Sequence, residues 1–344
     1  MHFQEQEAKR ADMGVIVKNI SYYLPQQILT NHDLEVAFPG WSAAKIEKKV
    51  GIKSRHIAGA DETALDMAEK ACKKLFEECD SQLIDYVLFC TQSPDYPLPT
   101  TACILQKRLN LRKNIGALDF NLGCSGYIYG LSLAKGLISA GIAKNVLLVT
   151  SETYSKYMSK NDRSNRSIFG DAATATLLSF SENDGIGNFY LGTDGSGADN
   201  LIVKNGGARN HYNPDAESYE YQSSSFITDN NLYMNGPEIF NFTLEAVPQM
   251  VEEALKANNT DLSHIDYIVF HQANKYMLKS LMTIMQLPAE KFYINLEETG
   301  NTVSSSIPLA LKQAMENGFI RNGDRVLVAG FGVGYSYGAT IVSI

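Results

Sequence analysis

The sequence predicts a layered α/β protein made of two similar halves that stack into five layers, α/β/α/β/α. Two apolar motifs recur in the same order. Ile-Asp-Tyr at residues 84–86 returns 181 residues later at 265–267, and the run at 145–149 returns 180 residues later at 325–329. Two matches in nearly one register indicate a duplication. Strand-like and helix-like segments alternate within each half, which is typical of layered α/β folds.

The elements of each half follow from their residue patterns. Residues 63–79 and 245–257 have apolar side chains at three-to-four spacing, which predicts a helix before each Ile-Asp-Tyr motif. The motifs themselves are short continuous apolar runs, as expected for strands that are buried on both faces. Residues 192–228 are rich in Gly, Asn, Ser and Tyr, so we expect irregular surface loops there.

The boundary between the halves is expected in the polar, glycine-containing stretch 181–187. We therefore predict an N-terminal half over residues 14–183 and a C-terminal half over 184–344. The N-terminal half carries the candidate nucleophile described below, and the C-terminal half carries a candidate histidine and asparagine.

Bulk properties exclude several classes of protein. The 344 residues are 44% hydrophobic and 20% charged, as in globular proteins, and no apolar run reaches the roughly 18 residues of a membrane helix. Residues 1–12 do not have the pattern of a signal peptide. The net charge of −8 argues against nucleic-acid binding. Five cysteines without a C-x-x-C pair suggest neither a zinc site nor a disulfide framework, so we expect a reducing cytoplasm.

Cys124 is the most informative residue of the chain. It follows an apolar strand-like stretch and Gly123, and a helix-like segment follows at 127–137. A cysteine at such a junction faces the free N–H groups of a helix start, which favour the reactive thiolate. The other interpretation is a small buried hydrophobe, as most free cysteines are. Its counterpart in the second half is Ser304, which lies in another turn before a helix-like segment.

Three polar segments follow or interrupt the predicted strands, at 123–126, 271–274 and 300–302. In parallel α/β sheets the strand ends build the active site, and cysteine with a distant histidine and asparagine is a nucleophilic pattern. Each segment alone also fits an ordinary structural turn. Together with the glycine-rich stretch at 330–339, they favour a catalytic site that contains Cys124, His271 and Asn301.

On these segments, the chain from about Gly14 to its end resembles the β-ketoacyl-acyl-carrier-protein synthase III enzymes of the thiolase superfamily. The resemblance implies the thiolase-like five-layer fold. Extending synthases of the superfamily have a second histidine where this chain has Asn301, so the initiating type is favoured. The other motifs that carry the resemblance are Arg55-His56-Ile57, Thr91-Gln92-Ser93, Phe169-Gly170-Asp171-Ala172 and Gly330-Phe331-Gly332.

The resemblance implies a decarboxylating Claisen condensation in fatty acid or related biosynthesis. Cys124 would take an acyl group from coenzyme A or a carrier, and a malonyl-carrier protein would then supply the nucleophilic carbon. The backbone N–H groups of Cys124 and Val333 would form the oxyanion hole. His271 and Asn301 would bind the malonyl thioester oxygen. No metal and no cofactor besides the substrates is implied, and Asp171 is expected to bond its local turn rather than react.

The resemblance also implies binding residues. Phe240, Gly236, Ala273 and Asn274 would line the channel for the pantetheine arm, Arg163 would flank the coenzyme A entrance, and Leu98 would close the acyl pocket of a partner subunit. Leucine is smaller than the phenylalanine that the family often has there, so a longer or branched acyl group is expected. Counted without gaps from Gly51, Lys45 and Lys49 occupy the family's Trp and Arg positions, and Trp41 lies one turn earlier. This register argues against adenine stacking between Trp and Arg planes.

The partners implied are an acidic acyl carrier protein and a second copy of the chain, with neither nucleic acid nor membrane. Carrier proteins are acidic, so a basic patch is expected at the entrance. Its candidates are Lys45, Lys49, Lys275 and Lys279, with Lys48, Lys53 and Arg55 beside them.

Two alternatives remain open. The chain could be an acyltransferase, or a specialised condensing enzyme for a secondary metabolite or surface polysaccharide, which keeps the acyl-cysteine and changes the acceptor. It could also be a non-catalytic partner in a synthase heterodimer, although such partners usually lose the nucleophile. Malonyl-dependent release of CO₂ separates condensation from plain acyl transfer.

Overall fold

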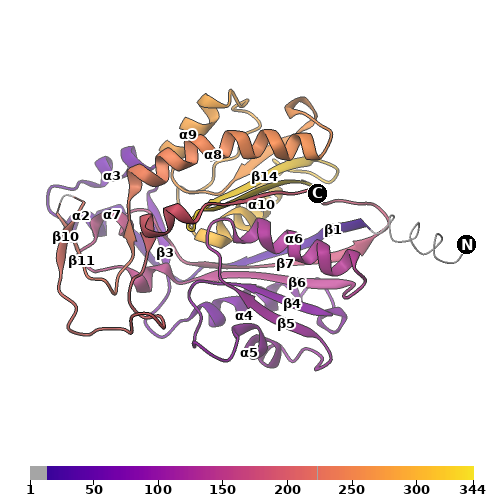
Figure 1. The fold of residues 1–344 in the computed structure, drawn as a ribbon, viewed down its shortest axis with the longest axis horizontal. Coiled ribbons are helices and arrows are strands. Elements are labelled where there is room, and N and C mark those ends of the chain that lie inside the picture. The colour runs from indigo at the N-terminus through magenta and orange to yellow at the C-terminus, as the bar shows by residue number, and fades with distance from the viewer. Residues whose placement is uncertain (1–13, 223) are drawn as a thin grey trace, which may run out of the picture.

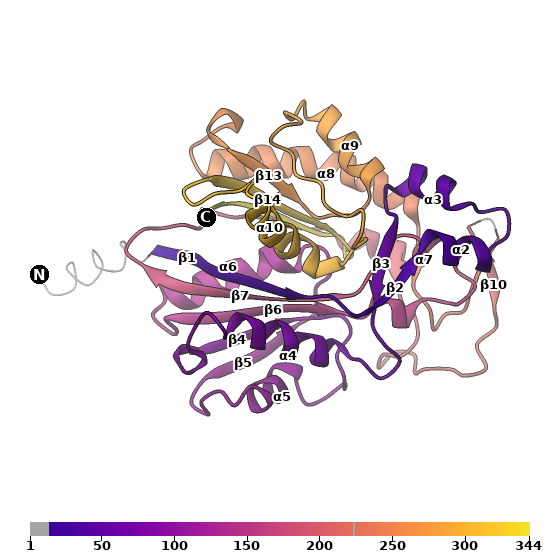
Figure 2. The same cartoon turned by 180° about the vertical axis from the view of Figure 1, so that it is seen from behind.

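The computed structural model describes residues 14–222 and 224–344, so the segment inspected for a signal peptide, residues 1–12, lies outside it. The described chain forms the five layers expected, with two sheets separated by a layer of helices (Figures 1 and 2). The first sheet has the strand order β1-β7-β6-β4-β5. Its strands are β1 (Gly14–Tyr23), β4 (Tyr86–Cys90), β5 (Gly116–Phe120), β6 (Asn145–Glu152) and β7 (Ala172–Ser181).

The second sheet repeats this arrangement. Its order is β13-β14-β15-β8, and β13 pairs in parallel with β14 as β4 does with β6. A bridge from Ile268 to Phe292 lies where β5 pairs with β4 in the first sheet. The strands are β8 (Tyr190–Thr193), β13 (Tyr267–Phe270), β14 (Arg325–Gly332) and β15 (Ser336–Ser343). The duplicated five-layer fold is thereby confirmed, whereas the boundary at 183/184 stays a prediction.

The recurring Ile-Asp-Tyr motif has a structural reason in both halves. The Asp85 carboxylate accepts from the N–H of Asn145 at 3.0 Å, at the start of β6. Asp266 accepts from the N–H of Arg325 at 2.8 Å, at the start of β14. Each aspartate thus aligns its own strand with the next, and the register of β4 on β6 equals that of β13 on β14.

Helices fill the layers as their apolar faces require. The central layer holds α6 (Gly126–Ser139) and α10 (Ser306–Glu316), which contact both sheets. One outer layer holds α4 (Ala64–Leu75) and α5 (Thr101–Arg108), and the other holds α8 (Gly236–Ala257) and α9 (Lys275–Ile284). The helix expected at 245–257 begins nine residues earlier, because the Asn235 side chain caps it and Pro237 fits its first turn.

Shorter elements gather at one end of the layers, where Figure 2 shows β2, β3, α2, α3 and α7 together. In its described part, the predicted irregular region 192–228 holds short strands, turns and the 3₁₀ helix Gly195–Asn200. The remaining elements are β2 (Gln27–Thr30), α2 (Asn31–Ala37), α3 (Ala43–Val50), β3 (Ser54–Ile57), α7 (Arg163–Arg166), β9 (Leu201–Ile202), β10 (Tyr219–Tyr221), β11 (Ser225–Ile227) and β12 (Tyr233–Met234).

Candidate active site

A cavity of about 640 Å³ opens at this end of the molecule, and both halves contribute to its walls. Cys124, His271 and Asn301 all line it, although they lie up to 177 positions apart. Cys124 comes from the turn between β5 and α6, His271 directly follows β13, and Asn301 precedes the turn into α10. The fold therefore brings together the three segments that the sequence analysis singled out.

The turn that carries Cys124 requires small neighbours. A Cβ on Gly126 would overlap the Cys90 sulfur, and a Cβ on Gly332 would lie 2.9 Å from the Cys124 sulfur. Glycine at position 332 therefore leaves the space in which the Cys124 sulfur sits. The N–H groups of Val333 and of Cys124 itself face this sulfur. These are the two backbone donors expected to form an oxyanion hole.

Cys124 is held as a thiol in the free protein. Burial and the nearby Glu152 carboxylate raise its pKa to about 12, and the two backbone N–H groups only partly oppose this increase. The expectation that the start of α6 favours a resting thiolate is therefore wrong, because loss of hydration outweighs the N–H groups in this apolar site. The same donors can still stabilise charge that develops on a substrate oxygen during attack.

The His271 side chain is buried at the wall of the cavity, and its imidazole is neutral. Burial lowers the pKa of its imidazole to about 3. Its Nδ1 lies 2.7 Å from the Ser306 hydroxyl, and its ring meets the Phe331 ring edge-on at a centroid distance of 5.8 Å. A neutral imidazole in this fixed orientation can present one N–H to a ligand in the cavity.

Asn301 is also fixed in orientation. Its backbone N–H donates to Ile168 at 2.9 Å, and its side-chain Oδ1 accepts from the Val303 N–H at 2.9 Å. The backbone of Thr302, with φ −96° and ψ 25°, turns the Val303 N–H back toward this oxygen. With Oδ1 used in this way, the amide NH₂ of Asn301 is the group left to donate into the cavity.

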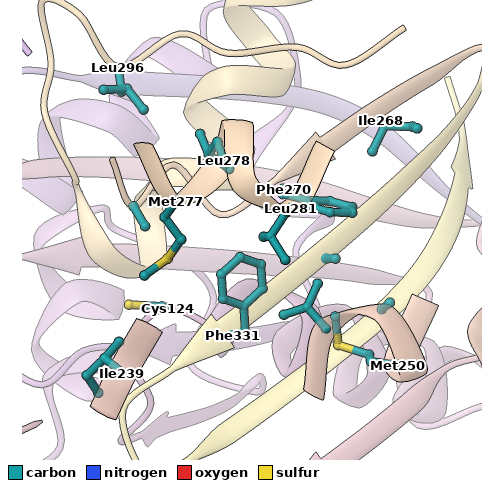
Figure 3. Packing of buried hydrophobic residues seen from close by; sticks show 14 of the residues in the cluster. Cys124, Ile239, Met250, Ile268, Phe270, Met277, Leu278, Leu281, Leu296 and Phe331 are labelled. Carbon is teal, nitrogen blue, oxygen red and sulfur yellow. The ribbon is translucent and has the colours of Figure 1, made fainter. Parts of the chain in front are cut away.

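The floor of the cavity is apolar. Figure 3 shows Cys124 at the edge of the hydrophobic cluster that also contains Ile239, Met277 and Phe331. These three side chains line the same cavity as the catalytic candidates. A site with such walls excludes water and so strengthens each hydrogen bond to a developing charge.

The expected channel residues Phe240, Gly236, Ala273 and Asn274 all line the cavity. Phe240 stacks on Tyr276 with ring centroids 5.4 Å apart, so the two rings form one aromatic wall. The Asn274 side chain accepts from the Met277 N–H at 2.9 Å and caps α9.

At the cavity mouth the structure corrects the register taken from the sequence. Trp41 lines the cavity, and the Arg163 guanidinium lies 4.8 Å from the centre of its ring. Trp41 precedes α3, which begins at Ala43, so an ungapped count along that helix missed its position. A tryptophan and an arginine plane therefore do meet at the mouth. Lys49 also lies over the Trp41 ring, at 5.2 Å.

Helices α3 and α9 bring the expected lysines to one surface beside this mouth. Lys45, Lys49 and Lys279 are exposed and Lys275 is half-buried. Lys48, Lys275 and Lys279 line a second cavity of about 400 Å³ together with Ala44, Glu47, Gly51 and Glu297. Lys53 forms an ion pair with Glu297.

Arg55 does not belong to this surface. It is 0% exposed, and its guanidinium donates hydrogen bonds to Leu29, Asn31 and Ser167. Arg55 therefore connects β2, α2 and the end of α7 inside the protein. Leu98 lies outside the cavity lining and is 80% exposed. Asp171 accepts from the N–H groups of Ala58 at 2.8 Å and Ser155 at 3.0 Å, which is the structural role expected for it.

Glu152 is a buried acidic residue near the site that the sequence analysis missed. Its carboxylate accepts from the N–H of Gln92 at 3.0 Å and from the hydroxyls of Ser93 at 3.1 Å and Ser304 at 3.0 Å. Burial raises its pKa to about 8. An acidic residue three positions after the apolar run 145–149 was the available signal.

Comparison with known proteins places this geometry in a family. Residues 118–195 match the sequence model of 3-oxoacyl-[acyl-carrier-protein (ACP)] synthase III, and residues 255–344 match that of its C-terminal part. A β-ketoacyl-[acyl-carrier-protein] synthase III of Methylococcus capsulatus is 36% identical over 93% of this chain and 96% of its own length.

Solved structures agree. A crystal structure of a 3-oxoacyl-(acyl-carrier-protein) synthase III is 46% identical, with a TM-score of 0.94 over 96% of this chain and all of that one. A 3-oxoacyl-(acyl-carrier protein) synthase of Burkholderia xenovorans is 37% identical, with a TM-score of 0.89 over 96% of this chain and 94% of its own. Within the described residues, no helix is long and apolar enough to cross a membrane.

Proposed function

Because this chain belongs to the β-ketoacyl-acyl-carrier-protein synthase III family of acyltransferases, we propose that it condenses an acyl thioester with a malonyl-carrier protein through an acyl-Cys124 intermediate. The observation that carries the proposal is the single cavity lined by Cys124, His271 and Asn301. The proposed reaction needs no metal or redox cofactor.

In the first half-reaction, the Cys124 sulfur attacks the carbonyl carbon of the acyl thioester. The thiol proton leaves the sulfur, and the carbonyl oxygen gains negative charge. The N–H groups of Cys124 and Val333 stabilise this charge by donating hydrogen bonds to the oxygen. The bond from carbonyl carbon to the departing sulfur then breaks. The departing thiol takes up a proton, and the acyl group stays on Cys124 as a thioester.

In the second half-reaction, a malonyl thioester enters the same cavity and loses CO₂. The electron pair of the broken carbon–carbon bond becomes an enolate, and its oxygen receives hydrogen bonds from His271 and Asn301. The enolate carbon attacks the acyl-Cys124 carbonyl, and the Cys124 sulfur leaves. The product is a 3-oxoacyl thioester, and the Cys124 thiolate takes up one proton from solvent, which restores the enzyme thiol. Two donors fixed in orientation suit this step, because they already point at the oxygen on which negative charge develops.

Mass spectrometry of the protein after exposure to a panel of acyl thioesters tests the first half-reaction. We expect a mass increase on the peptide that contains Cys124, and none in Cys124→Ala. Release of CO₂ from a malonyl thioester tests the second. An acyl-enzyme that forms without any malonyl-dependent CO₂ would instead identify a plain acyltransferase and refute the condensation.

The partner proposed for the lysine surface of α3 and α9 is an acidic acyl carrier protein. Three observations support this: Lys49 lines the catalytic cavity, Lys275 and Lys279 line the second cavity, and Lys45 is exposed on the same helix as Lys49. Replacing three of them with Gln should weaken carrier binding and lessen its dependence on salt. Unchanged carrier affinity in that variant would exclude this surface.

A homodimer is proposed through the free edge of β5. Within the described residues β5 pairs with β4 alone. The exposed Tyr96 and Leu98 lie in the loop between β4 and α5, so Leu98 is available to enter a partner's acyl pocket. Sedimentation should give twice the mass of the chain. Product analysis with acetyl-CoA and octanoyl-CoA side by side tests the effect of leucine, and a strict preference for acetyl-CoA would contradict it. The cytoplasmic location remains a prediction.

A further inference from the structure

We propose that Ser306 is a positioning residue that fixes His271 in the tautomer with hydrogen on Nε2, so that this nitrogen donates to the substrate oxygen. The inference rests on the proposed function for its consequence in catalysis. Its structural part, the tautomer, stands independently of turnover.

The hydroxyl of Ser306 has two contacts, and their directions are constrained. The N–H of Gln272 donates to Ser306 Oγ at 3.3 Å, which uses the oxygen as an acceptor. The other contact is His271 Nδ1 at 2.7 Å. Ser306 is only 2% exposed, so its own proton needs a partner inside the protein. His271 Nδ1 is the acceptor that the described contacts offer for it.

The opposite arrangement is unfavourable. If Nδ1 carried the hydrogen, Ser306 Oγ would accept from two N–H groups and its proton would have no partner in a buried place. A buried donor without a partner destabilises that arrangement. Nε2 would also become an acceptor that faces a negatively charged enolate oxygen, which is repulsive. Only the Nε2–H tautomer satisfies the serine and leaves a donor for the cavity.

The ring is held in this state from other sides as well. The edge-on contact with Phe331 limits rotation of the imidazole, and burial keeps it neutral, so protonation does not mask the tautomer near pH 7. Ser306 is the first residue of α10, and its helix packs on β13, the strand that ends at His271. The serine is thus fixed by the helix rather than by a mobile loop.

The test is nitrogen NMR of the full chain labelled with ¹⁵N-histidine, with His271→Asn used to assign the signal. We expect the wild-type His271 to show protonated Nε2 and unprotonated Nδ1. In Ser306→Ala the Nδ1–H form should become populated, and malonyl decarboxylation should fall roughly 10- to 100-fold, less than for complete loss of a donor. Ser306→Thr keeps the oxygen and should restore both. The rate of Cys124 acylation in Ser306→Ala and in Ser306→Thr should stay within about twofold of the wild-type rate.

Ser305→Ala is the matched control, because this neighbouring buried hydroxyl bonds to Thr150 and Ala172 instead of His271. It should leave the His271 signal unchanged. A wild-type ring with hydrogen on Nδ1, or an unchanged tautomer in Ser306→Ala, overturns the inference. Failure of the proposed function looks different, since wild-type protein would then release no CO₂ whatever the tautomer of His271.

Discussion

The two halves of the molecule share one kind of junction, in which a residue at the start of a central helix meets the end of a strand from the other half. One junction is filled and the other is open. In the repeat, Cys124 corresponds to Ser304 and Glu152 to Gly332, each 180 positions apart. Both junctions pair a residue at a helix start of one half with the last residue of a strand from the other half. Glu152 closes its junction by accepting from Ser304 at 3.0 Å. Gly332 leaves the other junction open, and the Cys124 sulfur occupies that space beside the cavity.

The strand ends differ in the same manner. Cys90 ends β4 and donates to Leu122 at 3.1 Å beneath the nucleophile turn, whereas its counterpart His271 lines the cavity. The backbones of the two halves are therefore equivalent at these positions. The size and polarity of the side chains distinguish the positions that pack from those that line the cavity.

The largest effect is expected from Cys124→Ala. Loss of the nucleophile should abolish the acyl-enzyme and lower condensation by roughly 10³-fold or more. Decarboxylation of the malonyl thioester should continue, because His271 and Asn301 are intact. Radioactive CO₂ release and intact-protein mass spectrometry follow the two steps separately. Condensation that survives in this variant would rule out Cys124 as the acyl carrier.

His271→Ala should remove a donor to the enolate oxygen and slow decarboxylation by about 10²- to 10³-fold, while acylation of Cys124 stays near the wild-type rate. The matched control is Cys90→Ala, the counterpart in the first half, which should leave decarboxylation within a few fold. Equal losses in both variants would mean that the strand ends matter only for folding. Stopped-flow measurement of CO₂ release gives the comparison.

Gly332→Ala should fill the open junction. Its Cβ would lie 2.9 Å from the Cys124 sulfur, so the nucleophile must move and acylation should fall about 10- to 100-fold. Gly136→Ala in α6 is the control, because no neighbour lies within 4 Å of its Cβ. A Gly332→Ala protein that acylates at the wild-type rate would show that the space is not needed. The rate of acyl-enzyme formation is the measurement.

The two half-reactions, acylation of Cys124 and decarboxylation at His271, should depend differently on pH. Because the pKa of Cys124 is raised to about 12, its thiolate fraction increases about tenfold with each unit that the pH rises, as long as the pH stays below that pKa. Where proton loss from the thiol limits attack, acylation should therefore accelerate from pH 6 to pH 9. The pKa of His271 is lowered to about 3, so this ring stays neutral and decarboxylation should be flat over the same range. A decarboxylation rate that titrates near pH 6.5 would contradict a neutral buried His271.

The smallest effect on Cys124 is expected from Glu152→Gln. The ionised Glu152 carboxylate raises the pKa of Cys124, so removal of its charge should lower that pKa and speed alkylation by iodoacetamide by a few fold. Because the pKa of Glu152 is about 8, the difference should appear above pH 8 and fade below it. The amide cannot accept from all three donors, so unfolding should also become easier by about 1–3 kcal/mol. Equal alkylation rates at pH 9 would exclude electrostatic coupling.

Features that depend on local patterns could be predicted from the sequence. The Ile-Asp-Tyr motifs could be recognised because each begins a short apolar run that recurs in the chain, although their aspartates bond to residues 60 and 59 positions away. The strand ends that carry Cys124 and His271 were identified because each follows an apolar run. The start of α8 lies nine residues before the segment expected as a helix, where Asn235 caps it and Gly236 and Pro237 suit a first turn.

Features that depend on distant contacts could not be predicted. The importance of Glu152 comes from Ser304, 152 positions away. Trp41 was misplaced because an ungapped count does not show how the chain turns before α3. Arg55 looked like a surface charge, and only its contacts with Leu29, Asn31 and Ser167 reveal that it is buried. The raised pKa of Cys124 follows from burial, which no residue pattern contains.

The shared cavity has a consequence for kinetics. Cys124, His271 and Asn301 line one space, and the aromatic wall of Phe240 and Tyr276 must guide the arm of both thioesters. The first thiol must therefore depart before the malonyl thioester binds, which is a double-displacement order. Double-reciprocal plots at several fixed malonyl concentrations should be parallel. The free thiol released in the first step should act as a competitive inhibitor of the second substrate.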